Sequence, residues 1–177
     1  RCRCVAGRLI RSAHARAATG TGQTRGVRAL ASAASGFLLA VLWFDLMFDV
    51  QVQGHSGPEL PPSVLDSIGT YYARVTTSAR PMNRLVALAM LVAIGALVAE
   101  VVRCDLARWR SITSLVLTLG AVGLAGARTV GDAVRLGTGA GDPTTRSVLA
   151  RRIRRDHLCC IAAIATSLLV QLLPLPS

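Results

Sequence analysis

The chain has 177 residues, of which 52% are hydrophobic and only 16% are charged, and its mean hydropathy is +0.50. A soluble domain carries about 25% charged residues, so this composition, with its apolar residues in long blocks, excludes an ordinary soluble domain and indicates a membrane protein. The net charge of +11 comes from arginine alone. Because the arginines lie between the apolar blocks and no nucleic-acid motif is present, this charge does not indicate a nucleic-acid partner.

Residues 1–28 contain seven arginines and no acidic residue, and they show no apolar period. Three interpretations fit this segment: a disordered basic tail at the membrane surface, a transit-like peptide, or a translated stretch upstream of the true start. In each of them the segment stands apart from the membrane domain, which we expect to comprise residues 29–177.

The first predicted span covers residues 29–48, which is the length of helix that crosses a hydrocarbon core of about 30 Å. Its small residues from Ala31 to Gly36 let a neighbouring helix approach closely. Asp45 and Asp49 lie four residues apart, so they share one helical face near the end of this span.

A short amphipathic helix is predicted after the glycines and prolines that follow the first span. Ser63 is its candidate N-cap, with Asp66 as the acidic partner of a capping box. Tyr71 and Tyr72 are typical of a membrane–water interface, so we expect this helix to lie on the membrane surface.

Three further spans are predicted at residues 82–102, 111–130 and 157–173, and the helix of the last span is expected to begin outside the membrane near Thr144. The third span contains Gly120, Gly123 and Gly126, which allow close helix packing. These glycines are also a candidate surface for a homo-oligomer.

Short connections make successive helices antiparallel neighbours. The predicted fold is therefore all-α: an integral membrane four-helix antiparallel bundle with a short interfacial helix between spans one and two. The N-terminal segment and the second connection carry seven and three arginines on one side of the membrane. The first and third connections carry three and seven on the other side, so the arginines give no orientation. Without residues 1–28 the count is three against ten, which would place both termini away from the cytoplasm. The expected location is the cytoplasmic (inner) membrane of a bacterium.

The antiparallel layout places the polar ends of all four spans on one membrane face. Two carboxylates at the C-terminal end of a helix oppose its dipole, and Arg84 and Arg128 are the expected partners that compensate them. The cluster is either an ion-paired network that fixes helix register or a polar pocket for a small molecule, a proton or a metal ion, with His157 titrating near neutral pH. The candidate residues are Asp45, Asp49, Asn83, Arg84, Arg128, Asp156 and His157.

Metal, nucleotide and nucleophile motifs are weak or missing. The sequence has no HExxH, no phosphate-binding loop and no GxSxG elbow, and its five cysteines match no zinc spacing. A metal site built from Asp45, Asp49 and His157 is possible by ligand type alone. The prediction is therefore no metal and no cofactor, and no residue is assigned as catalytic.

Two segments complete a recognisable layout: an arginine late in the third span ("GLAGARTVGDAVRLG") and a charged start to the fourth ("RRIRRDHL"). Over residues 30–174 this layout resembles that of the small four-span membrane proteins of the anthrone-oxygenase-like group. Some members of that group are associated with cofactor-free oxygenation of aromatic polyketide anthrones. The resemblance therefore implies a small hydrophobic, aromatic substrate, and it assigns no catalytic residue.

Three functional hypotheses follow. The first is a non-enzymatic interaction or small-molecule-handling module whose partners are the lipid bilayer, a second copy of the chain and a small hydrophobic ligand. The second is a membrane oxygenase-like enzyme with its pocket in the polar cluster. The third is a proton-coupled transporter that works as a dimer, because four spans are few for a transporter.

Overall fold

The computed structural model describes the backbone of residues 3–103 and 108–173, and the side chains of residues 25–79, 81–103 and 108–173. Within these ranges the chain is helical and contains no strand. Short irregular segments are a 3-10 turn, η1, and two π-helical segments, η2 and η3. In chain order the elements are α1 (Arg3–Asp49), η1 (Val50–Val52), α2 (Pro62–Ala73), η2 (Arg74–Ser78), α3 (Arg80–Arg103), α4 (Arg108–Leu124), η3 (Ala125–Thr129), α5 (Val130–Gly137) and α6 (Pro143–Leu172).

Four stretches of helix among the described residues are long and apolar enough to cross a membrane. The third of them runs through α4, η3 and α5 without a break. The prediction of four apolar helices at these places in the chain is confirmed, and each helix extends beyond the span expected for it. The stretches are Arg25–Val52, Pro81–Arg103, Arg108–Gly137 and Pro143–Leu172.

The outside of these helices is apolar, whereas hydroxyl groups are buried between them. A soluble protein shows the reverse distribution, and small polar residues are typical of contacts between helices in lipid. Large apolar side chains that are at least 60% exposed include Trp43, Phe44, Leu91, Val116 and Leu169. Hydroxyl side chains without exposed surface include those of Ser35, Ser114, Thr118 and Ser167.

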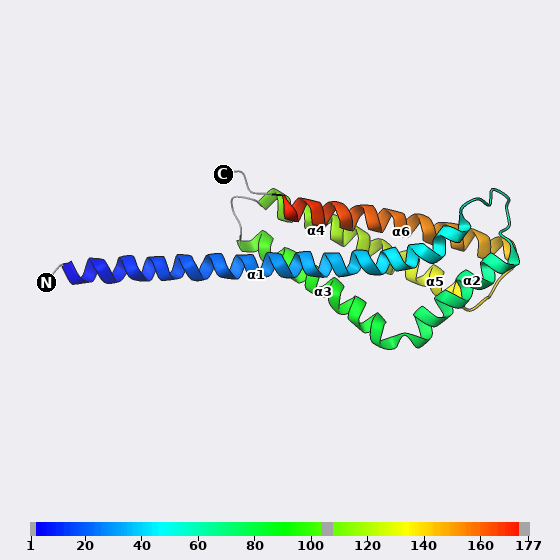
Figure 1. Cartoon of the computed structure of the whole chain (residues 1–177), viewed down its shortest axis with the longest axis horizontal. Helices are drawn as coiled ribbons and strands as arrows, with labels where there is room; N and C mark the ends of the chain where they lie inside the picture. The colour runs from blue at the N-terminus through cyan, green and yellow to red at the C-terminus, as the bar shows by residue number, and fades with distance from the viewer. Residues whose placement is uncertain (1–2, 104–107, 174–177) are drawn as a thin grey trace.

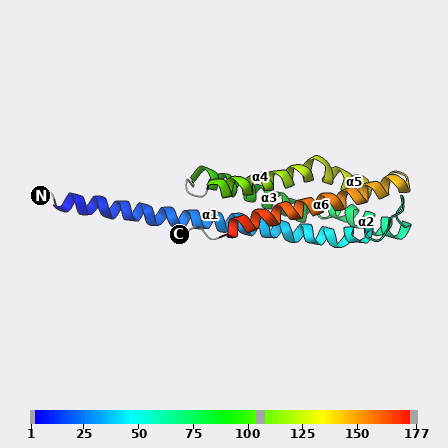
Figure 2. The ribbon, with the colours of Figure 1, turned by 90° about the horizontal axis from the view of Figure 1, so that it is seen from above.

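The long helices pack side by side (Figures 1 and 2). α1 packs along α3 and α6, and α4 packs along α6 and α3. Ala31 of α1 is fully buried against Ala96 and Leu97 of α3, so the small residues near the start of the first span do allow a close approach. The N-terminal part of α1 extends beyond the other helices as far as Arg3. That residues 1–28 form a separate basic segment stays a prediction.

The glycines of the third span do not contact another helix of the chain. A Cβ atom at Gly120, Gly123 or Gly126 would meet nothing within 4 Å. The close packing expected at these three glycines is therefore not found within the chain. Their outward face leaves the proposed contact with a second copy as an untested prediction.

α2 is the amphipathic helix expected between the first two spans. Its apolar face, with Leu65, Ile68 and Tyr72, is buried in a core shared with α5 and α6, so it faces protein. The expected N-cap at Ser63 is wrong. Pro61 is the N-cap and Pro62 begins the helix, because a proline loses nothing at a first position, where its missing N–H has no partner to donate to.

Candidate functional site

Asp49, the last residue of α1, joins three helices. Its side chain is fully buried. Tyr72 of α2 donates a hydrogen bond from its hydroxyl to Asp49 Oδ1 at 2.7 Å, and His157 Nδ1 of α6 lies 2.6 Å from Asp49 Oδ2. With Asp49 as a carboxylate, which only accepts, we assign the proton of this contact to Nδ1, which leaves the second ring nitrogen of His157 for another proton.

Asp45 lies one helical turn before Asp49 and has a phenol partner of its own. The hydroxyl of Tyr71 donates to Asp45 Oδ1 at 2.5 Å, and the Tyr71 ring stacks on Phe48 with centroids 3.8 Å apart. Two neighbouring tyrosines of α2 thus bind two carboxylates of α1 that share one helical face. Together these bonds fasten α2 to the end of the first span.

The two phenols are held in their neutral form. Burial, and then the hydrogen bond to Asp45, raise the pKa of Tyr71 well above its ordinary value of 10.0. Burial, and then the charge of Asp49, raise the pKa of Tyr72 further. Both hydroxyls therefore remain donors to the carboxylates at physiological pH.

Arg128 of η3 pairs with Asp156 of α6, not with the carboxylates of α1. Its Nε and Nη2 lie 2.8 Å and 2.5 Å from the two carboxylate oxygens of Asp156, which is 1% exposed. The expected pairing of Arg128 with Asp45 and Asp49 is wrong. α6 begins at Pro143, so Asp156 already lies inside the helix beside η3, where it takes up this guanidinium.

Asn83 and Arg84 do not join the cluster. The side-chain amide of Asn83 donates to the carbonyl of Val75 at 2.9 Å, and Arg84 is exposed. Figure 1 shows that the turn that leads into α3 lies apart from α6. Arg84 as a partner of Asp45 or Asp49 is therefore also wrong: the donors are Tyr71, Tyr72 and His157.

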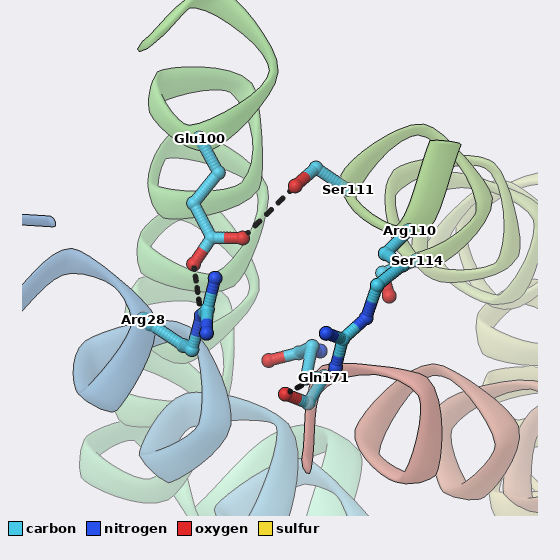
Figure 3. A pocket seen from close by; sticks show the side chains of 6 residues that line it. All are labelled: Arg28, Glu100, Arg110, Ser111, Ser114 and Gln171. Carbon is cyan, nitrogen blue, oxygen red and sulfur yellow. Dashed lines mark hydrogen bonds and ion pairs between the residues drawn. The ribbon is translucent and has the colours of Figure 1, made fainter. Parts of the chain in front are cut away.

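A second polar site lies at the other ends of the spans, beside the short arginine-containing link between the second and third spans (Figure 3). Arg110 of α4 is 6% exposed, and its guanidinium donates to the carbonyls of Val170 and Gln171 at the C-terminus of α6 at 2.6 Å and 3.2 Å. These are carbonyls that a helix end leaves without partners, so Arg110 caps α6.

Glu100 of α3 faces the same small cavity as Arg110. Ser111 donates to Glu100 Oε2 at 3.1 Å, and Arg28 Nε lies 3.9 Å from Oε1. The cavity has a volume of about 10 Å³, which holds one water molecule and no larger ligand. These residues therefore form a structural contact that joins the end of α3, the start of α4 and the end of α6 to Arg28 within α1.

Among the described residues, no group of three or more His, Cys, Asp or Glu side chains is placed to hold a metal ion. What the cluster around Asp49 can do chemically is bind a proton. It unites a carboxylate, an imidazole and a phenol by short hydrogen bonds, and two of these groups belong to different candidate spans.

Comparisons of the chain with protein-family models, with curated proteins and with solved structures find no match in any of the three. The resemblance to the anthrone-oxygenase-like group thus remains a prediction from layout.

Proposed function

We propose that the chain is a four-pass integral membrane protein, folded as an antiparallel bundle, that binds and releases a proton at the Asp49–His157 pair on one membrane face. The observation that carries this proposal is the contact of 2.6 Å between His157 Nδ1 and Asp49 Oδ2, both buried, in two different candidate spans.

The antiparallel bundle is supported by chain direction and by surface chemistry. In Figure 1, α1 and α4 run one way along the long axis, and α3 and α6 run the other way. Apolar side chains cover the outside, and hydroxyl groups such as those of Thr118 and Ser167 meet between α4 and α6 at 3.2 Å. The bacterial cytoplasmic membrane stays our predicted location.

Proton binding is supported by the kind of residues that meet here. Ionisable side chains within membrane-spanning segments are rare and costly, so they pair with one another and are candidates for function. Imidazole is the side chain that changes charge near neutral pH. The groups that set the charge around His157 are Asp45 and Asp49 from α1, Tyr72 from α2, Asp156 from α6 and Arg128 from η3.

A proton at this pair changes the net charge of the site that fastens α2 to the bundle, because Asp49 binds His157 and Tyr72 with its two oxygens. α2 is therefore the element whose contact with the first span depends on the charge of this site. A local charge change at a contact between two elements is one form that a pH-driven switch takes.

The oxygenase-like alternative is less well supported. A hydrophobic substrate needs a cavity beside the reacting groups. Neither the cavity of Figure 3 nor the groove described below is lined by Asp45, Asp49 or His157.

The proposal is tested by nitrogen NMR of histidine-labelled protein in lipid nanodiscs, where a protonated and a neutral imidazole give distinct signals. The chain has three histidines, and the variant His157→Gln assigns the signal of His157. We expect His157 to change between the two forms as pH is varied around neutrality, and Asp49→Asn to move the pH of that change.

The matched control is Asp66→Asn, which removes an exposed carboxylate of α2 and leaves the His157 signal unaltered. A His157 that stays in one form across the range in which free imidazole titrates, or that does not respond to Asp49→Asn, contradicts the proposal.

A further inference from the structure

A groove of about 370 Å³ lies between α2 with η2 on one side and the end of α5 with the connection to α6 on the other. This volume is in the range of sites for small molecules, which is about 300–1,000 Å³. Thr70 and Ala73 of α2 line the groove, whereas the neighbouring Tyr71 and Tyr72 do not. Thus α2 presents its tyrosines to the carboxylates and other residues to this groove.

The lining of the groove has positive charge that the protein does not compensate. Asp66 is the acidic residue among those that line the groove, and its Oδ1 lies 3.3 Å from Arg146 Nη2. This ion pair leaves no second carboxylate in the lining to pair with Arg74. Arg74 forms no ion pair with any residue in the described ranges. Nη2 of Arg146 also donates to the carbonyl of Leu65 at 3.3 Å. The groove thus retains one unpaired guanidinium, that of Arg74, beside the partly used guanidinium of Arg146.

Four residues with hydroxyl side chains line the same groove: Thr70, Thr77, Ser78 and Thr138. Thr77 donates its hydroxyl proton to the carbonyl of Ala73, and Thr138 donates its own to the carbonyl of Arg135. The hydroxyls of Thr70 and Ser78 are therefore the ones that can donate to an anion, while the guanidinium binds its other oxygens.

The base of the groove is a contact of two backbones. A Cβ on Gly137 would lie 2.7 Å from the backbone nitrogen of Ala73, and a Cβ on Gly69 would lie 3.4 Å from Arg146 Nη2. Glycine at these two positions therefore lets the end of α5 approach α2 and leaves room for the Arg146 guanidinium beside α2. The walls of the groove, α2 on one side and α5 on the other, are thus in direct contact at its base.

From this geometry we infer that the groove binds a phosphate group, with Arg74 and Arg146 as the cationic residues. Phosphate has the charge and the number of oxygens that the guanidiniums of Arg74 and Arg146 and the hydroxyls of Thr70 and Ser78 can satisfy. It can come from an anionic lipid headgroup, since Arg74 lies a few residues before the candidate span Pro81–Arg103, or from a free phosphate ester. The inference goes beyond the proton site and does not depend on it.

The experiment measures binding to purified protein in a detergent without phosphorus. One arm follows inorganic phosphate and glycerol 3-phosphate by phosphorus NMR. The other arm follows phosphatidylglycerol against phosphatidylcholine by native mass spectrometry. The test variant is Arg74→Gln, an exposed and unpaired residue whose loss leaves folding intact. Its control is Arg155→Gln, which makes the same charge change at an exposed position of α6 outside the groove.

We expect Arg74→Gln to weaken binding at least about tenfold, the loss of one charge-assisted contact, and Arg155→Gln to leave it unchanged. Weakening for the soluble phosphates identifies a free ester as the ligand, and weakening for phosphatidylglycerol alone identifies a lipid headgroup. Absence of binding in both arms, or equal weakening by the two variants, overturns the inference. Phosphate binding should persist in His157→Gln, because His157 does not line the groove. The phosphate site can therefore be tested even if the proton site proves wrong.

Discussion

Asp49 and Asp45 are tolerated in an apolar helix because each carboxylate has a neutral donor beside it. The sequence predicts their shared face, since a spacing of four residues places two side chains on one side of a helix. It does not predict their partners. His157 lies 108 positions from Asp49, and such a contact depends on how α6 packs on α1. Charge balance alone predicts arginines as the partners of the two carboxylates. Buried tyrosine hydroxyls donate to the same oxygens instead, and they do so without a second charge that would have to be desolvated.

Tyr71 and Tyr72 are the two tyrosines of the chain, so phenolate absorbance reports on this site alone. Because the pKa of each is raised in the folded state, their contribution to stability is complete below the ordinary value of 10.0 and is lost as pH rises beyond it. We expect folded protein in detergent to show no phenolate at the pH that half-ionises free tyrosine, and phenolate to appear together with unfolding.

The variants Asp45→Asn and Asp49→Asn serve as controls for this titration. Each removes the negative charge beside one phenol, so phenolate should then form at a lower pH than in the parent chain. A midpoint near 10.0 in the folded parent protein would show that the phenols are not bound to the carboxylates.

At the scale of elements, apolar length and breaker residues predict the helices well, because a membrane span needs about 20 apolar residues wherever it occurs. They predict contacts less well. Spacing predicts that the third span packs through Gly120, Gly123 and Gly126, but among the described glycines the tight contacts are at Gly137 of α5 and Gly69 of α2. Spacing alone does not show which glycine faces a neighbour, because that depends on how each helix is rotated against the helices beside it.

Gly137→Ala tests the contact between α2 and α5. The added Cβ would lie 2.7 Å from Ala73 N and 3.0 Å from the carbonyl carbon of Tyr72, so the two helices must separate. We expect a loss of stability of about 1–3 kcal/mol, the usual cost of overpacking, measured by thermal unfolding in detergent.

Gly131→Ala, also in α5, is the control, since its Cβ meets nothing within 4 Å. It should leave stability unchanged or raise it slightly, because alanine favours helix over glycine. Equal effects of the two substitutions would refute the close contact at Gly137.

For the whole molecule, composition predicts the class of fold, since lipid requires apolar surface and satisfied backbone groups along every span. Orientation could not be predicted, because arginines are balanced between the two sides. The concentration of ionisable groups at one end was predicted, and the structure does bring Asp45, Asp49 and His157 together there. The capped end around Arg110 was missed, since a single buried arginine leaves no pattern in the sequence.

The central claim is that four helices cross the membrane and place the Asp49–His157 end on a single face. The most direct test is labelling of single cysteines in sealed vesicles with a maleimide that cannot cross lipid. In a chain whose native cysteines are replaced, Ser56→Cys and Ala140→Cys report on the connections after α1 and α5, and Arg103→Cys reports on the end of α3. We predict that Ser56→Cys and Ala140→Cys are labelled from the same side and Arg103→Cys from the other. Labelling of Ser56→Cys and Ala140→Cys from opposite sides, or of all three from one side, would contradict it.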